Sequence, residues 1–395
     1  MQRLLKLSLN TLLNSGFNVL FYIILSFIFS ENISQVFTIT YPIQSLLLIL
    51  KSIFATGANI TKYKEDIKDA DDTGITIGII VGLILCILVI INLKNYKLFM
   101  NINDNSLNNF IIFSIILIFL QYIFSLILEK LYFQHKEQIA NFYTVIFNVV
   151  VFIVLILSSL IFYNEIITIV ITLFTATILI IYLFVQTANI SFYNFNIYKF
   201  IKYDSTSAFS HLLFFITYFI GLSNTFSFGN TYTLAMSFFT LLTDVQWDIF
   251  YNVRTLAKVD ISQGKFNYIS HKKNALILSI ILDISIIVLS LLIYPFYKPN
   301  LYIVLIFTIP TLIDFLVVPF YELKKYYLHI NYSPLKITIL VQISNILRTL
   351  CSFLPTPYCT LIGQEITIYL QLICIYFIFK KIYIIKKDGI ILKKL

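Results

Sequence analysis

Apolar runs of about 20 residues, bounded by charged residues or by clusters of Pro, Asn and Gly, recur along the whole chain. A helix needs ~20 consecutive apolar residues to cross a hydrocarbon core of ~30 Å, so each run is long enough to span a bilayer. The pattern predicts twelve spans, near residues 8–29, 33–58, 74–93, 107–128, 139–161, 166–187, 206–225, 230–252, 274–294, 301–322, 337–353 and 360–379.

Composition supports a membrane protein. Of the 395 residues, 59% are hydrophobic and only 12% are charged, and the mean hydropathy is +0.89. Soluble domains carry about 25% charged residues. Twelve crossings of ~20 residues use about 240 residues and leave short connections, which excludes a separate soluble catalytic domain.

The positive charges predict the orientation. The net charge is +9, and with a cytoplasmic N-terminus 23 Lys and Arg residues fall in inside segments against three in outside segments. This bias is typical of membrane topology rather than of nucleic-acid binding, so both termini are expected to be cytoplasmic. No metal or cofactor is predicted, because the cysteines lack metal-ligand spacing. They are Cys86, Cys351, Cys359 and Cys374.

The chain also contains an internal repeat. A shift of 196 residues places 60–63 on 256–259, and a shift of 195 places 128–133 on 323–328. Two pairings at nearly one offset favour two six-helix halves in the same orientation, although chance similarity in an Ile-, Leu-, Phe- and Lys-rich sequence is the alternative. Parallel repeats are typical of transporters whose substrate site lies between the halves.

Two stretches carry a family resemblance: ATGANITKYKEDIKDADDTGITIGIIVG (55–82) and NVRTLAKVDISQGKFNYISHKKNALIL (252–278). They resemble the multidrug and toxic-compound extrusion (MATE) family, within the superfamily that includes oligosaccharide flippases. The resemblance implies an all-α integral membrane protein with lobes at 1–197 and 198–395 around a central cleft. In that family the cleft opens alternately to each side as protons or sodium ions exchange on buried carboxylates.

The first span departs from that family pattern, whereas one position on the tenth span matches it. The family's first helix often carries an acid, whereas this chain has Asn10, Asn14 and Asn18, of which Asn14 and Asn18 are expected in the cleft. Some members carry an Asp about ten residues before the turn that follows the tenth helix. Asp314 lies nine residues before Leu323 and matches that position.

The acids within spans are the candidates for ion coupling, because ionisable groups at such depths are costly and often mark transport pathways. Asp244 and Asp248 lie four residues apart on one helix face, and Asp283 and Asp314 lie near mid-depth. We expect Asp244, Asp283 and Asp314, with Asp248 nearby, to bind H⁺ or Na⁺. The alternatives are that Asp248 sits in a wet vestibule and that Tyr, Asn and Thr partners merely satisfy the others.

Lys51 and Trp247 are expected in the cleft, because a shift of 196 residues relates them and Trp247 lies beside Asp248. A pair between Lys51 and Asp248 or Asp244 is predicted, and snorkelling of Lys51 to the interface is the alternative. Aromatic side chains that face the cleft would enclose an amphiphilic cation. The candidates are Tyr22, Phe37, Tyr41, Phe214, Tyr218 and Phe238.

Three further expectations concern structure rather than transport. Arg348 and Glu365 should pair across a helical hairpin. The glycines Gly74, Gly78 and Gly82 should form a smooth face for close helix packing. The mixed-charge segment 61–72 is expected to be a solvated connector, with a cation site as the alternative.

These features favour a monomeric, non-enzymatic antiporter that exports small organic, amphiphilic compounds across the plasma membrane in exchange for H⁺ or Na⁺. Its partners are the lipid bilayer and the substrate. A flippase for a lipid-linked oligosaccharide is the alternative, but it needs several basic side chains for pyrophosphate and only Lys51 qualifies. A membrane-embedded enzyme and an uncoupled scramblase are weaker alternatives.

Overall fold

The computed structural model contains two compact units, an N-terminal unit that ends at Ser227 and a C-terminal unit that begins at Phe228. The structure describes residues 19–102, 104–134, 136–193, 196–262, 266–332, 334–386 and 389–392. Asn14 and Asn18 therefore lie outside the described residues, as does the side chain of Asp248.

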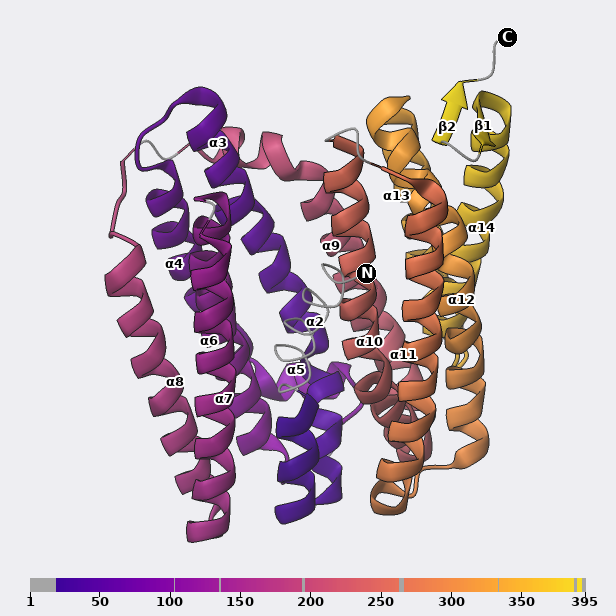
Figure 1. Cartoon of the computed structure of the whole chain (residues 1–395). Coiled ribbons are helices and arrows are strands. Elements are labelled where there is room, and N and C mark those ends of the chain that lie inside the picture. The colour runs from indigo at the N-terminus through magenta and orange to yellow at the C-terminus, as the bar shows by residue number, and fades with distance from the viewer. Residues whose placement is uncertain are drawn as a thin grey trace. The chain divides into compact units, whose positions relative to one another are not determined.

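The N-terminal unit is helical throughout its described part (Figure 1). A helix over Val19–Ile28 comes first. The elements that follow are η1 (Glu31–Ile33), α2 (Ser34–Lys51), the π-helical segment η2 (Ser52–Gly57), α3 (Ala58–Glu65), α4 (Ala70–Ile91), α5 (Leu93–Phe99), α6 (Asn108–Phe133), α7 (Glu137–Phe162), α8 (Glu165–Thr187) and α9 (Ile197–Ser227). Within this unit α6 is the central helix, because it packs against α2, η2, α4, α7 and α8.

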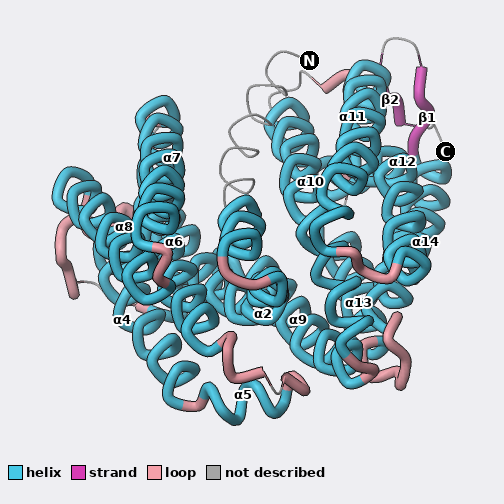
Figure 2. The backbone as a smooth tube through the Cα atoms, turned by 90° about the horizontal axis from the view of Figure 1, so that it is seen from below, coloured by secondary structure: helices cyan, strands magenta, loops and turns pink. Residues whose placement is uncertain are grey.

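The described part of the C-terminal unit is a bundle of five helices, viewed nearly along their axes in Figure 2. They are α10 (Asn230–Ser262), α11 (Tyr268–Tyr297), α12 (Leu301–Asn331), α13 (Pro334–Cys351) and α14 (Cys359–Ile382). Here α12 is central and packs against the other four. A short antiparallel hairpin of β1 (Tyr383–Lys386) and β2 (Gly389–Leu392) follows α14, with Tyr383 opposite Leu392.

The prediction of an all-α membrane protein is confirmed. Among the described residues, nine helices are long and apolar enough to cross a membrane. The remaining three predicted spans also fall on helices. They are Val19–Ile28, the more polar α10 and the 18-residue α13. This is a multi-pass membrane protein.

The helix boundaries follow the predicted repeat. Moved by 196 residues, the continuous helix from α2 to α3 coincides with α10, since Ser34 falls on Asn230. The same shift lays α4 on α11, α6 on α12, and α8 on α14, each to within a few residues at the start. The lobe boundary at 197/198 stays a prediction; α9 packs against α2, η2 and α3.

Asparagine caps explain why several helices begin where the sequence turns polar. The side-chain oxygens of Asn164, Asn267 and Asn300 accept hydrogen bonds from the first turns of α8, α11 and α12. An Asn at the N-cap satisfies backbone N–H groups that have no partner within the helix. Such caps make the polar clusters between apolar runs good predictors of helix starts.

The glycine face predicted on α4 is confirmed. A Cβ on Gly74 would lie 2.2 Å from the Phe54 carbonyl oxygen of η2, and one on Gly82 would lie 2.7 Å from the Tyr122 ring of α6. Only hydrogen fits at these crossings, so the glycines allow close packing of α4 against both neighbours.

Candidate functional site

A buried ion network lies at the start of α4 in the N-terminal unit. Lys62 Nζ lies 2.7 Å from Asp71 Oδ2, and Lys130 Nζ lies 2.6 Å from Asp72 Oδ1 and 3.7 Å from Asp71 Oδ2. Asp71 is 1% exposed and Asp72 and Lys130 are each 5% exposed. The expectation of a solvated connector over residues 61–72 was therefore wrong for Asp71 and Asp72. They belong to the first turn of α4, where lysines from α3 and α6 neutralise them.

The same network holds the segment that follows α8. The backbone N–H of Asn189 donates to Asp72 Oδ1 over 3.0 Å. The Thr73 hydroxyl donates to the Tyr193 carbonyl over 2.6 Å, and the Ser191 N–H donates to Thr76 Oγ1 over 3.1 Å. These bonds join residues more than 110 positions apart, so the role of the acids is to organise this unit.

Lys51 lies at the junction of α2 and η2, where it contacts Glu129 of α6. Its Nζ is 3.6 Å from Glu129 Oε2, and the Thr56 hydroxyl donates to Glu129 Oε1 over 3.2 Å. The Lys51 side chain is 30% exposed. The predicted pair with Asp244 or Asp248 joins the two units and stays a prediction. Within its own unit the partner of Lys51 is Glu129, which the sequence analysis did not single out.

Four of the six candidate aromatic residues form one row in the N-terminal unit. The rings of Tyr22 and Phe37 lie 5.4 Å apart, those of Phe37 and Tyr41 6.2 Å apart, and those of Tyr41 and Tyr218 4.7 Å apart in an edge-to-face arrangement. Tyr22 is buried and its hydroxyl hydrogen-bonds Ser114 at 2.5 Å, whereas Tyr41 and Tyr218 are partly exposed. This exposed end suits contact with an aromatic or cationic molecule.

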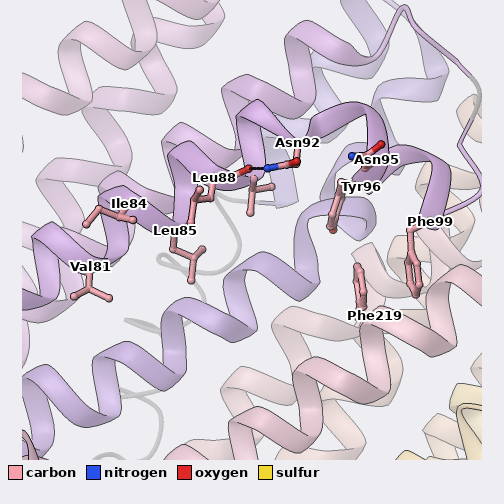
Figure 3. Close-up of a pocket in the computed structure, with 10 residues that line it drawn as sticks. Val81, Ile84, Leu85, Leu88, Asn92, Asn95, Tyr96, Phe99 and Phe219 are labelled. Carbon is pink, nitrogen blue, oxygen red and sulfur yellow. Dashed lines mark hydrogen bonds between the residues drawn. The ribbon is translucent and has the colours of Figure 1, made fainter.

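An apolar pocket of about 590 Å³ lies beside α4 and α5 (Figure 3). Its lining is Val81, Ile84, Leu85, Leu88, Val89, Asn92, Asn95, Tyr96, Phe99 and Phe219. The rings of Phe99 and Phe219 stack at 4.2 Å, and Ile84 and Leu88 are more than half exposed on the apolar surface of α4. None of the ten lining side chains carries a charge, so this pocket has no group that could couple ions.

Lys97 is buried at the predicted outer end of the same unit. Its ammonium group donates to the Asp104 carbonyl over 2.7 Å, to Asn108 Oδ1 over 2.7 Å and to Asn105 Oδ1 over 3.0 Å. Burial lowers the pKa of Lys97, and Asp104 opposes that shift. Hydrogen bonds from Ser106 lower the pKa of Asp104, with a smaller contribution from Lys97. This cluster fixes the segment before α6.

Asp314 has no exposed surface and is the most deeply buried of the three predicted ion-coupling acids whose side chains the structure describes. It lies on α12 between Pro310 and Pro319, which α12 accommodates without a break. Gln364 of α14 donates to Asp314 Oδ2 over 2.8 Å, and no donor of the described residues reaches Oδ1. Glu365 follows Gln364 on α14, and no donor of the described residues reaches its Oε1.

Arg348 of α13 packs against Gly363 of α14, one residue before Gln364. Gly363 allows that approach, because a Cβ there would lie 2.9 Å from the Arg348 carbonyl oxygen. The pair between Arg348 and Glu365 stays a prediction.

The other predicted acids lie on neighbouring helices of this unit. Asp283 of α11 is partly exposed, and no donor of the described residues reaches its Oδ1. Asp244 lies on α10 and is also partly exposed. The rings of Trp247 and Phe315 are tilted by 37° with centroids 4.5 Å apart, and Phe315 follows Asp314 in the sequence. The joint site of Asp244, Asp283 and Asp314 stays a prediction.

A second buried ion pair lies nearer the C-terminal end of α12. Lys325 Nζ pairs with Glu322 one turn earlier and donates to Gln371 Oε1 over 3.2 Å. Gln371 in turn donates to the Ser344 hydroxyl over 2.7 Å, which links α12, α14 and α13. Sequence reasoning placed Lys325 in a loop and did not weigh Glu322, although the repeat had aligned Lys325 with Lys130.

Comparison with solved structures decides the fold. The chain aligns over 95% of its length with an inward-facing multidrug resistance MATE family transporter of the MOP superfamily, with 93% of that chain covered, a TM-score of 0.62 and 13% identity. A MATE transporter from Vibrio cholerae aligns over 96% of both chains, with a TM-score of 0.63 and 11% identity. The chain has the MATE transporter fold.

Another match is a MOP superfamily transporter from Pyrococcus furiosus, whose reversed binding-pocket polarity suggests a different function. It aligns with 95% of this chain and 94% of its own length, with a TM-score of 0.62 and 13% identity. No family model and no curated protein matches the sequence. At such low identity the MATE likeness shows the fold, and function rests on this chain's own residues.

Proposed function

We propose that the protein is an ion-coupled antiporter that exports small organic, amphiphilic compounds across the plasma membrane by alternating access, with both termini cytoplasmic. The observation that carries this proposal is the fully buried Asp314 carboxyl on the central helix of a unit with the MATE fold. The solved relatives include proteins described as multidrug resistance transporters.

Ion binding at Asp314 is proposed to change how α12 packs against the neighbouring helices. An ionised carboxylate without a full set of partners is expensive in a low-dielectric interior, and binding H⁺ or Na⁺ removes that charge. Asp314 lies on α12, which contacts α10, α11, α13 and α14, and Gln364 connects it directly to α14. Filling or emptying the site therefore changes the packing of the whole unit. Asp244, Asp248 and Asp283 are proposed to contribute to the same coupling.

The substrate class rests on the aromatic row and on the partners of the basic residues. Tyr41 and Tyr218 offer ring faces and edges at the exposed end of the row. Lys51, Lys130 and Lys325 are each paired with a carboxylate, so these three cations do not form the pyrophosphate-binding surface that an oligosaccharide flippase needs. We therefore favour efflux over flipping and over enzymatic chemistry.

The proposal is tested in proteoliposomes loaded with a fluorescent dye cation, under a proton gradient or a sodium gradient imposed separately. Gradient-driven dye movement that protein-free vesicles lack supports the proposal. Dye movement that ignores both gradients, or movement of a fluorescent lipid-linked sugar without dye transport, contradicts it.

A further inference from the structure

Two lysines share an aromatic surface where α11 begins and α12 ends. Lys272 Nζ of α11 lies 4.4 Å from the ring centroid of Phe320 on α12. In return, Lys324 Nζ of α12 lies 5.9 Å from the ring centroid of Tyr268 on α11. On each helix the ring and the lysine are four residues apart, so they occupy one face. This reciprocal arrangement places both ammonium groups at the same crossing of α11 and α12.

Helix α14 adds two more rings to this surface. Lys324 Nζ lies 5.0 Å from the ring centroid of Tyr376 and 5.5 Å from that of Phe379. The Phe379 ring stacks on Tyr268 with centroids 6.5 Å apart, and Tyr383 of β1 lies 5.4 Å from Phe379. Neighbouring rings therefore hold one another in place, and a ring face attracts an ammonium group.

The described partners of both ammonium groups are rings. No carboxylate of the described residues pairs with Lys272 or Lys324. The acid nearest to Lys324 along α12 is Glu322, which pairs with Lys325 instead. Two positive charges at one helix crossing repel each other, and rings attract them without neutralising them. The crossing therefore favours an anion.

The two lysines lie at the depth of lipid headgroups. Lys272 is four residues from the start of the span Tyr268–Leu292, and Lys324 is four residues from the end of the span Leu301–Leu328. At ~1.5 Å per residue, both lie about 6 Å inside the helix ends. Lysines at such positions extend to the interface, where aromatic side chains also gather. This end of the unit is predicted to be cytoplasmic, so the leaflet is the inner one.

An exposed apolar stripe on α12 leads to Lys324. Its members recur every three or four residues and are between 39% and 51% exposed; they are Ile309, Ile313, Leu316 and Phe320. Lys324 occupies the next position on the same face. An exposed apolar surface of a spanning helix is a contact surface for membrane lipid. An acyl chain along this stripe brings its headgroup to the two lysines.

We propose that Lys272 and Lys324 bind the phosphate of an anionic glycerophospholipid of the inner leaflet, whose acyl chain lies along the stripe on α12. Charge selects the headgroup. Phosphatidylcholine brings a cation of its own to a site that already holds two, whereas phosphatidylglycerol brings only the anionic phosphate. The lipid is a resident ligand where α11 crosses α12 and not the exported compound, so the site stands whether or not the protein is an antiporter.

The test is a titration by native mass spectrometry of the purified full-length protein in detergent, with phosphatidylglycerol and phosphatidylcholine of identical acyl chains. A lysine near an anionic lipid surface contributes about 1 kcal/mol, which is about fivefold in affinity. We expect wild-type protein to bind phosphatidylglycerol more tightly than phosphatidylcholine. Lys272→Gln and Lys324→Gln should each weaken phosphatidylglycerol binding about fivefold, and Lys324→Arg should retain it.

Lys273→Gln is the matched control, because Lys273 is an exposed neighbour on α11, and it should bind phosphatidylglycerol like the wild type. Equal affinity for the two lipids, wild-type affinity in both Gln variants, or an equal loss in Lys273→Gln overturns the site. Displacement of phosphatidylglycerol by an equal concentration of glycerol phosphate shows that a soluble phosphate is the ligand and overturns the lipid. Thermal unfolding without added lipid shows whether each variant is folded, and if one Gln variant is not, the other decides.

Discussion

Lys130 of α6 and Lys325 of α12 lie 195 residues apart at equivalent positions of the repeat, and both are buried against carboxylates. The acids differ in origin. Asp72 comes from the neighbouring helix α4, whereas Glu322 precedes Lys325 on α12 itself. The central helix of each unit thus keeps a buried ammonium group, and its counter-charge comes from different elements.

Removing the cation of the first pair should destabilise the protein strongly. Lys130→Met leaves Asp72 buried without its closest charge partner, and such a loss costs about 3–5 kcal/mol. The free energy of unfolding in mild detergent measures the effect. Lys136→Met, at an exposed position, is the matched control and should change it by less than about 0.5 kcal/mol. Equal effects of the two variants would show that the pair does not stabilise the fold.

The stability lost by breaking the Lys325–Glu322 pair should be partly restored by a second substitution. Lys325→Met leaves Glu322 buried and uncompensated, so the midpoint of thermal unfolding should fall. Adding Glu322→Gln removes the stranded charge and should recover part of the loss, because two neutral groups tolerate burial better than one ion does. Lys273→Met, an exposed change on α11, controls for loss of a surface lysine. A double variant less stable than Lys325→Met would contradict this account.

Alanine substitutions in the glycine face of α4 should lower the free energy of unfolding by different amounts. In Gly74→Ala the new methyl group meets the Phe54 backbone carbonyl at 2.2 Å, and the helices must separate. In Gly82→Ala it meets the Tyr122 ring at 2.7 Å, and a side chain yields more easily than backbone. Overpacking typically costs about 1–3 kcal/mol, so Gly74→Ala should lie at the upper end and Gly82→Ala below it. Unfolding free energies in the reverse order would refute the packing argument.

Charge exchange can decide the partner of Lys51. The structure pairs it with Glu129 at 3.6 Å, while the repeat predicts a pair with Asp248 or Asp244 in another state. Lys51→Asp should reduce transport, and recovery with Glu129→Lys identifies the observed pair as the functional one. Recovery with Asp248→Lys instead supports a pair formed across the two units during the cycle. Full activity of Lys51→Asp alone would show that neither pair matters.

The helices could be predicted from sequence because their causes are local. Apolar runs of about 20 residues fix the spans, and Asn164, Asn267 and Asn300 mark helix starts by capping them. The repeat offset followed from two short similarities and matches the observed helix boundaries.

The contacts of the charged side chains could not be predicted in the same way. Asp72 bonds Asn189 from 117 positions away, and Asp314 bonds Gln364 from 50 positions away. Hydrophobic periodicity says which face of a helix is buried, but not which neighbouring helix faces it. For that reason the sequence pattern placed Lys130 in a loop, whereas it lies within α6 and pairs with Asp72. The hydrophobic pattern gives no sign of the π-helical segment η2 or of the terminal hairpin.

The most direct test of ion-coupled export compares dye efflux from proteoliposomes that contain wild-type protein or Asp314→Asn, with binding of the same dye measured in parallel. We predict that an imposed proton gradient accelerates wild-type efflux, that Asp314→Asn reduces the gradient-driven rate at least tenfold, and that dye binding is retained. Undiminished gradient-driven efflux by Asp314→Asn would contradict the account.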